Sequence, residues 1–279
     1  MAIKDILVHL DSDDVGAVVV DAAVKMAKAH DARLIGLYAG VPFDIPSYVV
    51  AQLPPEVIET HQKHVQESAR STADAFEKAC ADNDISYDIR TGDWRDPVES
   101  IICMHARYAD MVMIVQPENE ILSGRAREVA DHVVLRSGAP VVIVPRKPAR
   151  TGAGARVLIG WDGRRHAARA VKDALPILAA AESVKILAVD PKPGVAGLGD
   201  LPGADLAQYL ATHGVKAEAD HKVSGSLRVG DVLLNEAAEI GADLIVTGAY
   251  GHARLGELIL GGVTDTLMEE MTIPVFMSH

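Results

Sequence analysis

The stretch RVLIGWDGRR (residues 156–165) indicates how the chain folds. An apolar run of strand-forming residues ends there in an acid, Asp162, and a segment with helical spacing follows directly. The stretch DILVHLDSDD (residues 5–14) repeats this pattern and ends its apolar run at Asp11. A short run of Val, Ile and Leu bounded by a turn is typical of a buried strand.

Two further landmarks recur in the same order in both halves of the chain, which chance similarity rarely produces. They are YADMVMIV (108–115) with GADLIVTG (241–248), and SGAPVVIVP (137–145) with MTIPVFMSH (271–279). An ordered set of recurring segments is typical of a duplicated structural unit. The sequence therefore predicts two copies of one unit.

The segment PRKPARTGAGA (145–155) separates the two copies. Its Pro, Gly and basic residues show no apolar period, which is typical of a linker. We predict a boundary near Arg150, with one domain at residues 1–147 and a second at residues 152–279.

In each copy, short apolar runs alternate with longer segments of helical spacing. The strands predicted in the second copy are Val157–Trp161, Val184–Val189, Val215–Val223, Leu244–Thr247 and Pro274–Met277. The helices predicted between them lie at 165–181, 204–214, 228–241 and 263–271. Such alternation implies right-handed crossovers and a parallel sheet covered on both faces. The predicted fold class is α/β, with two tandem doubly wound, five-stranded parallel-sheet domains of Rossmann-like type.

The composition excludes several classes of protein. Hydrophobic residues make up 49% of the chain and aromatic residues only 4%, as expected for a core of Val, Leu, Ile and Ala. The net charge is −12 and no Lys/Arg cluster occurs, so we expect no nucleic-acid partner. Cys80 and Cys103 form no CxxC motif and are expected to be buried and reduced. No signal-like or membrane-length apolar segment occurs, which predicts a cytoplasmic protein without a membrane partner.

The strand ends of the second copy are the places to look for a binding site. In open parallel sheets, ligands bind at the carboxyl ends of the strands. Asp162, Val189 and Gly248 stand at or next to three of these ends. We expect them to lie around one crevice.

Glycines are concentrated in GAYGHARLGELILGG (residues 248–262). Gly248 ends a predicted strand, Gly251 follows three residues later, and Gly261 and Gly262 directly precede a predicted helix. A helix start has unpaired N–H groups, and glycines in front of it let a phosphate approach them. The alternative is a loop that needs positive φ angles and nothing else.

Three side chains near this segment have two interpretations each. Thr264 could donate a hydroxyl to a phosphate, or it could cap the helix. His252 could approach a phosphate, or it could be an exposed loop histidine. Asp162 could accept a hydrogen bond from a ribose hydroxyl or an adenine amine, and it could also cap the helix that follows.

The spacing Gly248-x2-Gly251-x9-Gly261, with Asp162 at a strand end in front, resembles the nucleotide-binding pattern of the universal stress protein family. The resemblance covers the whole chain as two tandem domains. It implies that Asp162 and the backbone near Val189 hold adenine and ribose. It also implies that Gly248, Gly251, Gly261 and Gly262 line the phosphates of ATP, with or without Mg²⁺. The family has Ser or Thr directly after the third glycine, where this chain has Gly262, with Thr264 two places on.

The first copy lacks these glycines. Opposite Gly248, Gly251, Gly261 and Gly262 it has Val115, Glu118, Arg127 and Glu128. Side chains would fill the hollow, and carboxylates would repel a polyphosphate. We therefore expect that the first domain binds no ATP and pairs with the second domain.

The leading hypothesis is an ATP-binding regulatory protein of the stress response, with its site in the second domain and at most slow hydrolysis. The alternative is an interaction module of the same fold without nucleotide. Its final strand, PVFMSH (274–279), could pair edge to edge between domains or chains. By resemblance, this pairing implies a pseudo-dimer inside one chain, with a homodimer as a further option.

The sequence shows no dedicated catalytic set. No GxxxxGK[ST] or G-x-S-x-G motif occurs. An adenylate-forming enzyme would carry a Ser/Gly-rich loop after the first strand, where this chain has DSDD or DGRRH. His61 and His64 lie one helical turn apart without further ligands at a metal-binding spacing, so we expect neither an enzyme nor a metal site.

Overall fold

The computed structural model describes residues 2–11, 16–39, 53–93, 95–118, 124–191, 202–251 and 262–279. Within these ranges, the first half of the chain forms β1 Asp5–His9, β2 Arg33–Tyr38, β3 Tyr87–Thr91, β4 Met111–Val115 and β5 Val141–Val144. The second half forms β6 Arg156–Gly160, β7 Ser183–Val189, β8 Ala217–Lys222, β9 Leu244–Gly248 and β10 Val275–Ser278. The strands predicted in the second copy are therefore present, with ends that differ by at most two residues.

Helices occupy the segments between the strands. Those of the first half are α1 Gly16–His30, α3 Pro55–Ala81, α4 Val98–Ala106 and α5 Gly124–Arg136. Those of the second half are α6 Arg165–Asp173, α7 Leu175–Ala180, α8 Ala204–Thr212, α9 Val229–Glu239 and α10 Gly262–Glu270. The segment predicted as one helix at 165–181 is divided, because Pro176 in the first turn of α7 has no N–H to continue α6.

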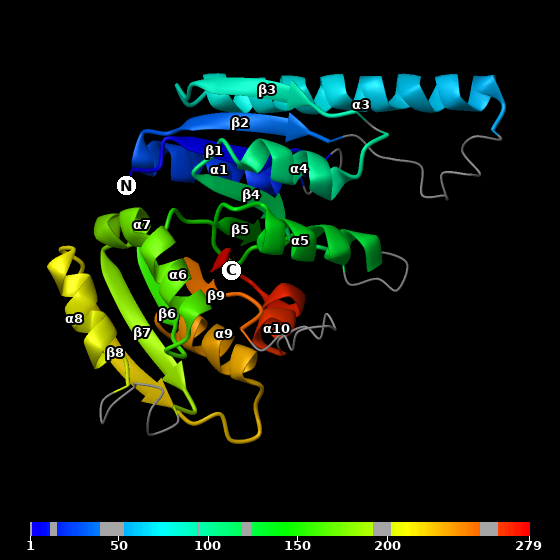
Figure 1. The fold of residues 1–279 in the computed structure, drawn as a ribbon. Coiled ribbons are helices and arrows are strands. Elements are labelled where there is room, and N and C mark those ends of the chain that lie inside the picture. The colour runs from blue at the N-terminus through cyan, green and yellow to red at the C-terminus, as the bar shows by residue number, and fades with distance from the viewer. Residues whose placement is uncertain are drawn as a thin grey trace.

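The strands lie in one sheet, in the order β3-β2-β1-β4-β5-β10-β9-β6-β7-β8 (Figure 1). Within each half all neighbours are parallel, which confirms the predicted doubly wound α/β fold in two tandem units. The halves meet where β5 and β10 run antiparallel, with Phe276 opposite Val142. The final strand therefore pairs edge to edge between the two domains of one chain.

Helices cover both faces of the sheet, and each face has its own apolar cluster. Residues of α1, α3, α6, α7 and α8 pack on one face with Ile6 and Ile159. Residues of α4, α5, α9 and α10 pack on the other with Leu7 and Leu158. Because successive side chains of a strand point to opposite faces, each apolar run contributes to both clusters. The core therefore continues across the boundary between the halves.

Cysteine pairing, helix length and side-chain clustering complete the description of the fold. Cys80 and Cys103 are buried and form no disulfide. In the part of the chain that the structure describes, no helix is long and apolar enough to cross a membrane. Among the same residues, no three His, Cys, Asp or Glu side chains are grouped so that they could hold a metal ion.

The position of β10 at the centre of the sheet leads to a stability prediction. Phe276 is 1% exposed, and its replacement by Ala leaves a cavity in a core shared by both halves. We expect Phe276→Ala to lower the free energy of unfolding by about 3–5 kcal/mol, measured by urea denaturation. Val223→Ala is the control, because Val223 is 80% exposed and should change the free energy by less than about 0.5 kcal/mol. Equal effects of the two substitutions would contradict a shared core.

Candidate functional site

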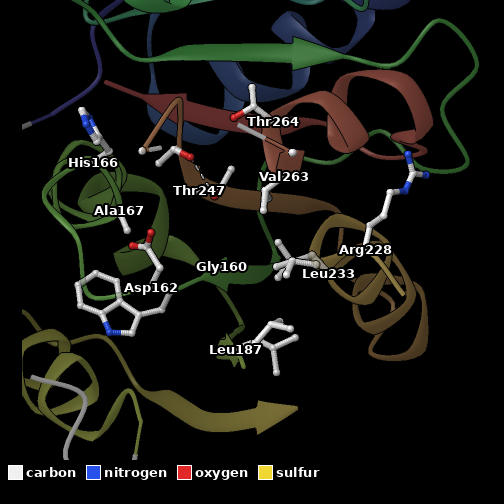
Figure 2. Close-up of a pocket in the computed structure, with 16 residues that line it drawn as sticks. Gly160, Asp162, His166, Ala167, Leu187, Arg228, Leu233, Thr247, Val263 and Thr264 are labelled. Carbon is white, nitrogen blue, oxygen red and sulfur yellow. Dashed lines mark hydrogen bonds between the residues drawn. The ribbon is translucent and has the colours of Figure 1, made fainter. Parts of the chain in front are cut away.

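A pocket of about 380 Å³ opens at the carboxyl ends of β6, β7 and β9 in the second half (Figure 2). Its size is within the range of small-molecule sites in proteins. Six of the eight residues predicted from the sequence line it: Asp162, Val189, Gly248, Gly251, Gly262 and Thr264. The other two, His252 and Gly261, lie outside the described residues. The fold thus brings together residues that are more than 100 positions apart in the chain.

The starts of three helices meet at this pocket. It is lined by His166 and Ala167 of α6, by Arg228 and Val229 at the start of α9, and by residues 262–264 of α10. The first N–H groups of a helix have no partner within the helix and carry the positive end of its dipole. The convergence of three such ends makes the pocket favourable for an anion.

Apolar side chains form another part of the wall. Leu187, Leu233 and Val263 line the pocket near Gly160. A Cβ atom at Gly160 would lie 3.2 Å from Leu233, which is closer than usual, so the glycine lets this leucine pack tightly against β6. Figure 2 shows Asp162 on one side of the pocket and Leu233 on the other. The pocket therefore offers an apolar wall for a flat ring and, at the helix starts, N–H groups for an anion.

Asp162 is the acidic side chain that lines the pocket. Its Oδ1 accepts a hydrogen bond of 2.9 Å from the N–H of Arg164, the residue before α6. The side chain is 49% exposed, and Oδ2 would be 3.8 Å from a Cβ at Gly251. One oxygen thus orders the entry into α6, while the other faces the glycine segment. Both interpretations of Asp162 are compatible with this geometry.

The glycines that line the pocket are required for different reasons. A Cβ at Gly248 would lie only 2.4 Å from the backbone nitrogen of Ala167 and 2.5 Å from the carbonyl carbon of His166. This glycine is therefore needed by the close approach of α6 to β9. A Cβ at Gly262, in contrast, would meet nothing within 4 Å. Of these two glycines, Gly262 is therefore the one that leaves free space at a helix start, that of α10.

Thr264 is buried in the first turn of α10, at 3% exposure. Its Oγ1 accepts a hydrogen bond of 3.3 Å from the N–H of Tyr250. The hydroxyl therefore ties α10 to the end of β9, and its own proton can still be donated toward the pocket. The structural role is present, and the role toward a ligand stays a prediction.

Sequence reasoning missed several residues of the wall, of which His166 and Arg228 are the most polar. The His166 ring stacks on His279 with 4.3 Å between centroids, and burial lowers its pKa, with His279 adding to the effect. Arg228 precedes α9, donates to Asp231 and is directed away from Asp162 (Figure 2). The position of both residues at helix starts after strands was a signal that could have found them.

The first half lacks the features that open this pocket. Strand register places Val115 opposite Val144 and Gly248 opposite Ser278, which confirms the equivalence of Val115 and Gly248 expected from the sequence. The same register places His9 of β1 where β6 has Gly160. His9 is half-buried, and desolvation lowers the pKa of its imidazole, so the first half has a ring side chain at the position where the second half has glycine.

The charged residues of the first half have partners that the sequence did not indicate. The Arg127 guanidinium donates to Asp131 of α5 and, across the domain boundary, to Asp265 of α10. Glu118, for its part, pairs with Arg146 at 2.9 Å. These side chains belong to contacts within and between domains. Long charged side chains take the partner that the packing of neighbouring helices provides, which local sequence does not show.

The fold and the pocket define a class: a tandem α/β protein with a candidate ligand pocket at the strand ends of its second half. A second cavity, of about 640 Å³, lies in the first half between α1 and α3 and includes Asp11 in its wall. The universal stress protein family model matches residues 2–145 and again residues 155–279. The chain therefore belongs to the universal stress protein family, with two of its domains in tandem. No curated protein is similar enough to count as a match.

Solved structures show the same fold over nearly the whole chain. A universal stress protein from Archaeoglobus fulgidus DSM 4304 is 16% identical, with a TM-score of 0.74, 98% of this chain covered and 95% of that chain. A putative universal stress protein from Pseudomonas aeruginosa UCBPP-PA14 is 14% identical, with a TM-score of 0.62, 99% of this chain covered and 93% of the other. At these identities the likeness shows the fold.

The different environments of the glycines predict different tolerance to alanine. Gly248→Ala places a Cβ against the backbone of α6 and should lower the free energy of unfolding by roughly 1–3 kcal/mol. Gly262→Ala is the matched control, since its Cβ faces open space and should cause no loss. Thermal or urea unfolding of both variants measures the difference. Equal free energies of unfolding in the two variants would show that the packing of α6 on β9 does not require glycine at position 248.

Proposed function

We propose that the second domain binds ATP in this pocket as a regulatory ligand, with or without Mg²⁺. The observation that carries the proposal is the convergence of three helix starts on a cavity with an apolar wall. Oriented N–H groups stabilise phosphate oxygens without a lysine or arginine. The apolar wall at Leu187 and Leu233 fits the flat face of a purine. The pocket thus has groups that can bind the phosphates of a nucleotide and an apolar wall that can bind its base.

We assign the residues of the pocket to two groups, one for adenine and ribose and one for the phosphates. Asp162 and the backbone at Val189 would hold ribose and adenine, because they lie at the ends of β6 and β7 beside the apolar wall. Gly248, Gly251, Gly262 and Thr264 would face the phosphates at the start of α10. The family pattern implies that Gly261 lines the phosphates as well, and we propose that His252, from the same glycine segment, approaches a phosphate. The first domain would bind no ATP, since His9 and Val115 stand where the second domain has glycine.

ATP is proposed as a ligand that reports a cellular state, and we propose at most slow hydrolysis. The stress response and a cytoplasmic location belong to the same proposal. Release of phosphate at many turnovers per minute would require a catalytic role that we do not propose. The alternative is an interaction module of the same fold, which acts through dimerisation and binds no nucleotide.

The direct test is thermal unfolding with and without Mg-ATP. A ligand at a hundred times its Kd stabilises the folded state by about 2.7 kcal/mol, so the Tm should rise by several degrees. Gly262→Glu should abolish the rise, because a carboxylate at the start of α10 occupies the open space and repels phosphate. Gly262→Ala should retain it. Absence of any shift in the wild type at millimolar ATP, ADP, AMP or cAMP would favour the interaction module.

A second substitution separates the two roles of Asp162. Asp162→Asn keeps an oxygen that can accept from the N–H of Arg164 but removes the charge that faces the pocket. We expect the unfolding free energy without nucleotide to change by less than about 0.5 kcal/mol. The Kd for ATP should rise about tenfold, because a hydrogen bond to a charged acceptor is lost. Unchanged affinity, measured by calorimetry, would assign Asp162 to the helix entry alone.

A further inference from the structure

A buried polar cluster connects the first domain to the back of the candidate pocket. The hydroxyl of Tyr250 donates to Oδ1 of Asp131 at 2.5 Å. Arg127 donates through Nε to the same oxygen at 2.8 Å and through Nη2 to Asp265 at 2.5 Å. Tyr250 is 3% exposed and Asp131 9%, so the contacts are largely shielded from water. Hydrogen bonds to charged groups in such surroundings are among the stronger ones in proteins.

The cluster crosses the boundary between the domains. Arg127 and Asp131 belong to α5 of the first half, while Asp265 belongs to α10 of the second. Tyr250 follows β9 by two residues and lies in the second half. Arg127 therefore stands between a carboxylate of each domain, and Tyr250 reaches from the second domain to the first. None of the four residues lines the pocket.

Tyr250 is held at both its backbone and its side chain. Its backbone has a φ of +57°, a left-handed conformation that is uncommon for a residue with a bulky side chain. Its N–H donates to Thr264 Oγ1 in the first turn of α10, at 3.3 Å. The side chain is fixed at its other end by Asp131. A strained conformation of this kind persists only when surrounding contacts determine it.

The neighbours of Tyr250 connect this arrangement to the pocket. Gly251, the next residue, lines the pocket, and so does Gly248 two residues before. Thr264, which accepts from the Tyr250 N–H, lines it as well. Rotation of Tyr250 out of its site would therefore move pocket-lining backbone on both sides. Burial and the neighbouring Asp131 hold the pKa of the Tyr250 hydroxyl well above its usual value, so it remains a donor at physiological pH.

We propose that Tyr250 is a positioning residue through which Asp131 of the first domain sets the geometry, and hence the affinity, of the pocket in the second domain. The first domain thereby acts as a built-in regulator of the site, although it contributes no residue to the pocket wall among those described. The part that concerns affinity rests on the proposed ATP function. The mechanical part, the coupling of Asp131 to residues 249–251, is testable without nucleotide.

The experiment compares Tyr250→Phe and Asp131→Ala, which removes the acceptor of the Tyr250 hydroxyl, with the wild type in the full chain. Tyr250→Phe removes only the hydroxyl and leaves Asp131 paired with Arg127, so the ring keeps its packing. Tyr209→Phe is the matched control, because Tyr209 lies on α8, contacts His213 and does not line the pocket. Amide hydrogen exchange of the nucleotide-free protein is measured in peptides that cover residues 249–251 and 262–264. The Kd for Mg-ATP is measured in parallel.

The proposal expects faster exchange at residues 249–251 in both variants and a Kd raised roughly five- to tenfold, with no change in Tyr209→Phe. The double variant should bind no more weakly than Asp131→Ala alone, since that substitution already removes the acceptor of the Tyr250 hydroxyl. Exchange equal to wild type in Tyr250→Phe would overturn the coupling. Normal ATP affinity despite faster exchange would overturn the regulatory part. If the wild type binds no nucleotide, the proposed function fails, and the exchange result alone decides whether the domains are coupled.

Discussion

The antiparallel pairing of β5 with β10 is the interaction on which the rest of the structure depends. Either strand alone would leave a row of unpaired N–H and C=O groups at the edge of its half. Every residue of both strands is buried, so pairing satisfies these groups where water cannot. The same pairing makes one ten-stranded sheet from two halves and brings α5 close enough to α10 for Arg127 to reach Asp265 (Figure 1).

The two halves share a topology and differ at the few positions that open or close a pocket. In the second half, Gly160 in β6 lets Leu233 pack closely, and Gly248 at the end of β9 lets α6 approach. The first half has His9 and Val115 at these positions. These differences at the strand ends are the ones on which the proposal of a nucleotide site in the second half rests.

Much of the candidate site could be predicted from the sequence, because strand ends and helix starts can be located from apolar spacing. Asp162 and Val189 follow from that rule, and both line the pocket. The reason for each glycine could not be predicted in the same way. Gly248 is needed by the approach of α6, a helix whose distance from β9 is set by packing. Arg127 was assigned to its own domain for the same reason: the helix that faces it belongs to the other half.

The sequence by itself determined the family, the duplication, the alternation of strands and helices, and the edge of the sheet at which a ligand would bind. These properties depend on local periodicity and on repeated order, which are written along the chain. Only the tertiary structure decided that the halves form one sheet and that Tyr250 bonds to Asp131, 119 positions away. Such contacts have no period in the sequence, because they arise where two separately folded surfaces exclude water and must pair the polar groups they bury.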